Sequence, residues 1–223
     1  MKKSIIKRSI GIIISLTVIL SVLYFSKDII QNAFKSSENI QETSSQIAND
    51  SSNLFEVHMI NIGIGDSILI KSNDKAMLID GGENDVGDKV LSYIKSQNVK
   101  KLDYIVASHP HSDHMGGLDY VVNNFDCENI ILSTVKESAT PTTKTYKDFL
   151  FAIKSKKLNV IKAITGKTFN LGDSTIEILG PVKEYEDLND SSVVLKVTFG
   201  NTKFLFTGDI EKTAEQDLID SGV

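Results

Sequence analysis

The chain has 223 residues and a formal net charge of −5, with 41% hydrophobic and 24% charged residues. This length allows one sizeable domain plus an appendage, and the composition argues against disorder of the whole chain. The single cysteine, Cys127, excludes an intrachain disulfide and a cysteine-rich zinc site, and we expect it to fill a small apolar gap.

Charge is unevenly distributed along the chain. Residues 1–35 hold six basic residues against one acidic residue, whereas the remainder holds 18 basic against 28 acidic residues. Such an acidic balance is not typical of a protein that binds nucleic acid through its general backbone charge. Two bound dications would still attract a phosphodiester locally.

Residues 1–35 predict an N-terminal membrane anchor. A basic cluster ending at Arg8 precedes residues 9–26, which are uncharged, mostly apolar and just long enough to cross a bilayer as a helix. No clear small-x-small cleavage site follows, which favours an uncleaved anchor over a cleaved signal peptide. The basic residues would stay in the cytoplasm, so we expect a single-pass protein of the cell membrane with its domain outside the cytoplasm. Secretion after signal cleavage is the alternative.

Residues 36–53 form a polar, serine- and asparagine-rich tract without apolar periodicity. This composition predicts a flexible linker.

From residue 54 onward, short β-rich runs alternate with amphipathic helical patterns. Strands are predicted at residues 54–60, 67–70, 76–79, 102–107, 130–132, 160–164, 175–179, 193–199 and 203–206. Helices are predicted at residues 88–98, 118–125, 144–157 and 211–220. Gly200-Asn201 predicts a hairpin between the last two strands. The mixture indicates an α+β fold in which two mixed sheets pack face to face with helices outside.

Three of the four histidines fall within Ser108–Gly117. Imidazole nitrogens and carboxylate oxygens are the usual ligands of zinc. On extended backbone, residues two apart point the same way, so His109, His111 and Asp113 can face one pocket with His114 beside them. One metal could take the first two residues and a second could take Asp113 and His114. Gly116-Gly117 would let the backbone turn tightly before a helix. The alternative is a solvated polar turn.

The H-x-H-x-D-H pattern of residues 109–114 resembles the signature of the metallo-β-lactamase superfamily. Residues 57–67, 78–82 and 204–209 are similar to further blocks of the hydrolase domain of ComEC-type competence proteins. The resemblance covers residues 54–223. It implies an αββα fold, that is, a metallo-β-lactamase-like two-sheet sandwich flanked by helices.

The resemblance also implies site residues. Asp209 takes the place of the carboxylate that bridges two metals, although a helix cap for the segment at Glu211 is the alternative. Asp80 takes a place whose carboxylate does not bind metal but holds the ligating histidines by hydrogen bonds, with a simple Asp-Gly turn as the alternative. The implied ligands are His109, His111 and Asp209 for the first metal, and Asp113, His114 and Asp209 for the second.

Other polar residues receive weaker assignments. Asp66 lies in a glycine turn, but Asn61 and Ile64 stand where the family usually has an acid and an amide, which weakens any contact of this turn with substrate. His58 alternates with apolar residues on a strand, which favours a structural role.

The implied activity is metal-dependent hydrolysis, in which a dinuclear site activates water and Asp113 or Asp209 accepts a proton. Zinc is the expected metal and manganese the alternative. The expected substrate is DNA or another phosphodiester outside the cytoplasm, and no protein partner can be inferred. A non-catalytic binding domain with an incomplete metal shell is the second hypothesis.

Two departures from the family pattern bear on this expectation. No histidine lies between His114 and Asp209, and the chain stops before the His-His-Gly-Ser block of the family. We therefore expect a partial, C-terminally incomplete domain whose final strands are missing and whose second sheet exposes an apolar edge.

Overall fold

The computed structural model describes residues 31, 35 and 54–222. The predicted anchor at residues 9–26 and the predicted linker at residues 36–53 lie outside the described residues. Among the helices that are described, none combines the length and the apolar character needed to cross a membrane.

The first sheet has six strands in the order β1-β2-β3-β4-β5-β6. Their bounds are β1 (Phe55–Met59), β2 (Ile68–Ser72), β3 (Lys75–Ile79), β4 (Leu102–Ala107), β5 (Cys127–Leu132) and β6 (Asn159–Lys162). The first three strands pair antiparallel, whereas β3 to β6 pair parallel. Parallel neighbours need long crossovers, which here contain α2 (Gly87–Ser96), α4 (Leu118–Asn124) and α5 (Lys144–Lys156).

The second sheet is an antiparallel meander in the order β10-β9-β8-β7. Its strands are β7 (Thr168–Leu171), β8 (Ser174–Gly180), β9 (Val194–Phe199) and β10 (Thr202–Phe206). The hairpin predicted between the last two strands is present, and Gly200 adopts a φ of 56° there. The sequence pattern does not predict β7, because this four-residue strand fully buries only Leu171 and its alternation of buried and exposed residues is too short.

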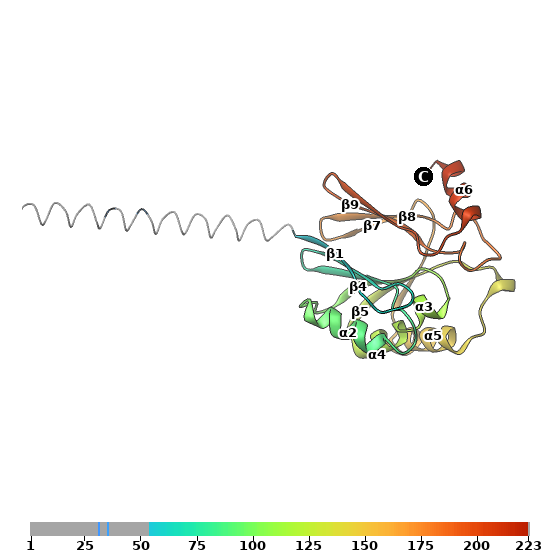
Figure 1. Cartoon of the computed structure of the whole chain (residues 1–223), viewed down its shortest axis with the longest axis horizontal. Coiled ribbons are helices and arrows are strands. Elements are labelled where there is room, and N and C mark those ends of the chain that lie inside the picture. The colour runs from blue at the N-terminus through green and yellow to red at the C-terminus, as the bar shows by residue number, and fades with distance from the viewer. Residues whose placement is uncertain (1–30, 32–34, 36–53, 223) are drawn as a thin grey trace, which may run out of the picture. The chain divides into compact units, whose positions relative to one another are not determined.

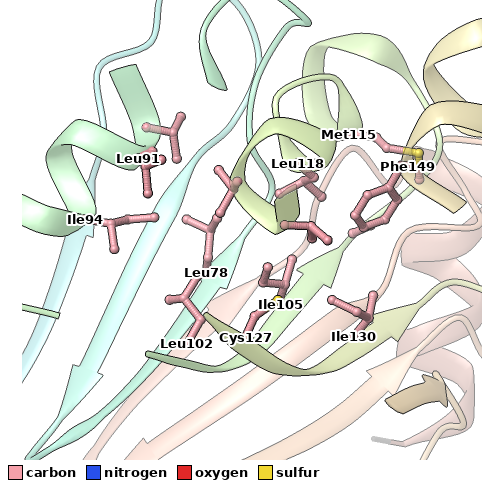
Figure 2. Close-up of a cluster of buried hydrophobic side chains, with 14 of the residues drawn as sticks. Leu78, Leu91, Ile94, Leu102, Ile105, Met115, Leu118, Cys127, Ile130 and Phe149 are labelled. Carbon is pink, nitrogen blue, oxygen red and sulfur yellow. The ribbon is translucent and has the colours of Figure 1, made fainter. Parts of the chain in front are cut away.

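The two sheets face each other, and α2, α4 and α5 cover the outer face of the first sheet (Figure 1). Between the sheets, Ile70 and Met77 of the first pack with Ile176 and Leu195 of the second. Under the helices, Leu78 and Ile105 of the first sheet point toward helix residues such as Leu118 and Phe149 (Figure 2). The predicted sandwich of two sheets with flanking helices is therefore confirmed.

The outer side of the second sheet carries only α6 (Lys212–Ser221) among the described helices. There, a groove of about 400 Å³ is lined mostly by apolar residues of β8, β9, β10 and α6, and Leu205 on the edge strand β10 is exposed. The predicted incompleteness of the second sheet stays a prediction.

Candidate metal centre

The candidate centre lies where parallel strands of the first sheet end. Asp80 directly follows β3, and Ser108 and His109 follow β4, which pairs parallel with β3. Because parallel strands end at the same edge of a sheet, these residues meet there. The Ser108 backbone N–H donates to Asp80 Oδ1 at 2.8 Å, and the Ser108 hydroxyl donates to Asp80 Oδ2 at 2.6 Å.

The histidine loop is only partly extended. His111 has extended backbone angles, but the short helix α3 (Ser112–Met115) starts immediately after it and carries Asp113 and His114. The expected alternation along a fully extended loop is therefore wrong from Ser112 onward. The histidines still converge, because His109 Nε2 lies 3.1 Å from His111 Nδ1 and the ring centroids of His109 and His114 are 4.3 Å apart.

Gly116 and Gly117 do not form the tight turn that was expected. Both have right-handed helical backbone angles, and they join α3 to α4. Their role is close packing: a Cβ on Gly117 would lie 2.2 Å from the Gly81 backbone oxygen, and one on Gly116 would lie 2.5 Å from the Asn84 backbone nitrogen. Only glycine therefore allows the helices to approach the loop that follows β3.

Asp209 reaches the histidines from the second sheet. It follows β10 by way of Gly208, whose φ of 54° brings the chain against Ser192 and Ser108. Its Oδ2 lies 3.2 Å from His114 Nε2, and 43% of its side chain is exposed. One ligand atom each of His109, His114 and Asp209 lies within 4.8 Å of the others.

Asp209 does not cap the following helix. The backbone N–H groups of Glu211 and Ala214 donate instead to Asp190 Oδ1, at 2.9 and 3.3 Å. The helix-cap alternative for Asp209 is therefore wrong, and Asp190 takes that role. The Asp209 carboxylate is left facing His114.

Asp80 orients the histidine side chains. It is 1% exposed, and its Oδ2 lies 2.9 Å from His114 Nδ1. Because a carboxylate only accepts, His114 Nδ1 carries a proton and Nε2 points to the centre. The Ser108 hydroxyl gives its hydrogen to Asp80, so it accepts from His109 Nδ1 at 3.1 Å. Asp80 and Ser108 thus bind the Nδ1 atoms of the two rings and leave both Nε2 atoms free to face the centre. Asp80 therefore does more than form an Asp-Gly turn.

The two buried histidines have opposite pKa shifts. Burial, together with the nearby His114 and His111, lowers the pKa of His109 to about 3. Burial also opposes charge on His114, but the hydrogen bond and charge of Asp80, with the charges of Asp209 and Asp113, outweigh it and raise its pKa to about 9. His109 is therefore a neutral imidazole, the form that ligates metals, and His114 lies in the most negative part of the centre.

Asp113 lies beside the same ring, with its Oδ2 3.8 Å from His114 Nε2. His109, His114 and Asp209 therefore form one cluster from one loop and one distant segment. His111 and Asp113 lie beside this cluster rather than in it, next to His109 and His114 respectively. Imidazole nitrogens and carboxylate oxygens at this spacing fit a divalent cation of the zinc or manganese type. The individual ligand roles stay predictions.

The glycine turn before β2 lies closer to the centre than the sequence pattern indicates. Asp66 offers an oxygen within 4.8 Å of ligand atoms of Asp80 and His114. Gly65, with a φ of 84°, packs so closely that a Cβ there would lie 1.6 Å from the Asp113 backbone oxygen. Two glycines within the three residues before an acid were the available signal, because such a turn permits close approach to another backbone.

Two residues lie in structural environments. His58 on β1 contacts Glu56 Oε2 at 2.8 Å and the Tyr93 hydroxyl at 3.0 Å, consistent with the structural role expected for it. Cys127 is buried in the core under the helices, as expected of a gap-filling residue.

Comparison with known proteins adds independent findings. A sequence model described as "Metallo-beta-lactamase superfamily" matches residues 60–223. ComE operon protein 3 of Bacillus subtilis strain 168 is 25% identical over 74% of this chain, and YcaI of Escherichia coli K12 is 26% identical over 74%. These matches cover only 23% and 20% of the two relatives, so this chain corresponds to a part of each.

Solved structures show the same architecture. A metallo-β-lactamase with a HARLDQ motif from Cronobacter sakazakii superposes with a TM-score of 0.51 at 16% identity, covering 74% of this chain and 71% of that one. At such low identity the likeness concerns the fold alone.

Proposed function

Because this chain belongs to the metallo-β-lactamase superfamily, whose members are generally metal-dependent hydrolases, we propose that it hydrolyses phosphodiesters with metal-activated water. The observation that carries the proposal is the convergence of His109, His114 and Asp209, with ligand atoms within 4.8 Å of one another. Asp209 reaches this cluster from a different sheet. A solvated polar turn would not recruit a carboxylate across the fold.

We propose two divalent metal ions, with zinc as the metal. The cluster of His109, His114 and Asp209 supplies nitrogen and oxygen donors that suit such ions. His109 and His111 would hold one ion, Asp113 and His114 the other, and Asp209 would serve both. A bound divalent ion lowers the pKa of a coordinated water toward neutrality and stabilises negative charge on the attacked group.

The side chains supply orientation and proton transfer. Asp80 keeps His114 in the tautomer that presents Nε2 to the centre, and Ser108 does the same for His109. The carboxylates of Asp113 and Asp209 are partly exposed, at 34% and 43% of their side chains, so either can accept a proton and pass it to solvent. No serine or cysteine nucleophile is required.

DNA is the proposed substrate, on the strength of the resemblance to ComEC-type competence proteins and the similarity to ComE operon protein 3. Another phosphodiester outside the cytoplasm is the alternative, in keeping with the predicted anchor and the predicted extracytoplasmic domain. A β-lactamase activity is less favoured, since the motifs around the histidine loop resemble the competence proteins.

A non-catalytic binding domain is the second candidate. This candidate is favoured by the small number of ligands, because each potential metal cluster among residues 54–222 contains only three residues. Metal content separates the two candidates. Two equivalents of zinc or manganese per chain support the enzyme, and fewer than one supports the binding domain.

The test combines metal analysis with hydrolysis of bis-p-nitrophenyl phosphate by the full chain, purified in non-ionic detergent and loaded with zinc or manganese. We expect metal-dependent hydrolysis that His109→Ala and Asp209→Asn reduce at least about a hundredfold. His58→Ala, which removes a histidine far from the centre, is the matched control and should retain activity. A folded, metal-loaded chain that hydrolyses neither this diester nor single-stranded DNA would refute the phosphodiesterase proposal.

A further inference from the structure

The positive charge of the folded domain is concentrated in one segment. Residues 136–167 contain eight lysines and two acidic residues, whereas the rest of residues 54–222 contains ten lysines and 23 acidic residues. The segment includes α5. An acidic domain therefore has one lysine-rich segment, centred on α5.

That segment has a regular arrangement on α5. Lys144, Lys147, Phe151 and Lys154 are spaced by three, four and three residues, which places them on one face of a helix, and we call them the α5 stripe. All four are exposed, and Phe151 is exposed by 71%, while the opposite face of α5 is buried in the core. An exposed phenylalanine between lysines has no packing role in the fold.

Two lysines of the stripe are available for a ligand. Lys144 pairs with Asp148 on the next turn. Over residues 54–222, Lys147 and Lys154 form no ion pair. They lie seven residues apart, which is about 10 Å along the helix.

The stripe starts at the rim of the metal centre. The Thr145 hydroxyl donates to Asn84 Oδ1 at 2.8 Å, which ties the start of α5 to the loop after β3. Tyr146 lines a small cavity together with His109 and Met115. Figure 2 shows Phe149 of α5 beside Met115 of α3, the helix that also carries His114. These contacts place the first turn of α5, where the stripe begins, next to α3 and the loop after β3.

We propose that the α5 stripe binds a single-stranded nucleic acid and guides it to the metal centre, an inference that rests on the proposed phosphodiesterase function. Lysines attract backbone phosphates, and an exposed aromatic ring stacks on a base. The ring of Phe151 favours a single strand over other polyanions, because only a single strand offers unstacked bases. Bases of a duplex are stacked on one another, and a polyol phosphate chain has no aromatic group to offer.

An anionic bilayer is the competing occupant, since exposed phenylalanine flanked by lysine also suits a membrane surface. Two observations favour the nucleic acid. The stripe is a single row on one helix rather than a broad apolar face, and its N-terminal end lies beside the loop that follows β3 and leads from Asp80.

Binding is measured by fluorescence anisotropy with a labelled 12-nucleotide thymidine strand, using the full chain in non-ionic detergent and EDTA so that hydrolysis plays no part. We expect the Lys147→Glu/Lys154→Glu variant to bind at least about tenfold more weakly at low salt. Its slope of log affinity against log salt should be shallower by about 1.4, from two lost contacts on a single strand. Lys89→Glu/Lys95→Glu, two exposed lysines on α2, makes the same charge change and should bind like the parent. Equal weakening by both variants would overturn the proposal.

The role of Phe151 has its own readouts. Phe151→Leu should weaken binding about fivefold or more, and Phe151→Tyr should restore it, because stacking needs the aromatic ring. The chain has no tryptophan, so Phe151→Trp supplies a unique reporter. Its emission should be quenched by the strand, whereas a tryptophan introduced by Leu205→Trp on β10 should be unaffected.

A blue shift of the Phe151→Trp emission with phosphatidylglycerol vesicles but no quenching by the strand would overturn the proposal in favour of membrane docking.

Cleavage of bis-p-nitrophenyl phosphate separates this inference from the proposed function. The Lys147→Glu/Lys154→Glu variant should retain hydrolysis of this small diester, which has no strand to lie along α5. Loss of strand binding with intact hydrolysis of the small diester is therefore the expected pattern. A wild-type chain that hydrolyses the small diester but does not bind the strand would refute the stripe alone.

Discussion

Replacing Asp80 with asparagine tests whether the buried carboxylate prepares the histidines for metal. Asparagine keeps the size of the side chain and tolerates the φ of 58° found at this position. It removes the charge and replaces one acceptor oxygen with an NH₂ group. The Nδ1–H of His114 would then meet either a neutral acceptor or a second donor.

The magnitude follows from three contacts of the Asp80 carboxylate, with the backbone N–H of Ser108, the hydroxyl of Ser108 and Nδ1 of His114. A hydrogen bond to a charged group contributes about 1.5–3 kcal/mol and a neutral one about 1 kcal/mol. The three charged bonds together contribute about 4.5–9 kcal/mol, and asparagine can keep two of them as neutral bonds of about 2 kcal/mol in total, so we expect the free energy of unfolding to fall by about 2.5–7 kcal/mol. Metal binding needs the neutral His114 ring with its proton on Nδ1. If the variant instead favours the neutral tautomer that is protonated on Nε2, metal affinity should fall about 10- to 100-fold.

Asp103→Asn is the matched control. Asp103 is also buried, and its carboxylate accepts from the Ala76 backbone N–H and the Lys75 amine, but it lies at the opposite end of β4. Urea unfolding in EDTA measures the stability of both variants without a contribution from bound metal. Chelator competition then measures zinc affinity. The reasoning is refuted if Asp80→Asn binds zinc as tightly as Asp103→Asn.

Three further predictions concern the turn at Gly65, the cap of α6 and the buried thiol of Cys127. Gly65→Ala should lower the free energy of unfolding by several kcal/mol and weaken metal binding, because the new Cβ would overlap the Asp113 backbone. Gly63→Ala has open space around it and should cost only about 1–2 kcal/mol of backbone strain, as measured by urea unfolding. Equal effects of the two variants would contradict the packing role of Gly65. Asp190→Ala should lower the free energy of unfolding by about 1–2 kcal/mol because α6 loses its cap, and unchanged urea unfolding would show that the two N–H groups find other partners. Burial, reinforced by the charge of Asp126, raises the pKa of the Cys127 thiol to about 11. Roughly one thiol in a thousand is therefore ionised at pH 8, and thiol reagents should react far more slowly than with the urea-unfolded chain. Since the folded state holds this proton more tightly, stability should be unaffected by this group below about pH 9 and should fall between about pH 9 and pH 11, as unfolding curves across that range would show.

Local sequence patterns predicted most of the fold. The strand at Leu102–Ala107 is found at its predicted bounds, and the other predicted elements are found with ends that differ by a few residues. Their apolar residues repeat with the period of a strand or a helix, which is a property of neighbouring residues. Thr168–Leu171 was missed and Ser112–Met115 was placed in a loop, because elements of four residues have too few positions to show a period.

The candidate site divides in a similar way. His109, His111, Asp113 and His114 could be found from sequence because they lie within six positions, so their clustering does not depend on the fold. Asp209 was found through its resemblance to a family motif. Its closeness to His114 depends on the second sheet packing on the first.

The sequence alone determined which residue types are available and which segments form strands and helices, since both depend on chemistry and periodicity along a short stretch. Only the tertiary structure decided that Asp190 rather than Asp209 caps α6, that Asp80 and Ser108 together orient two histidines, and that Asp66 lies beside the centre. These contacts join residues distant in sequence. Their formation depends on how the two sheets and the glycine turns pack, and no local pattern encodes that.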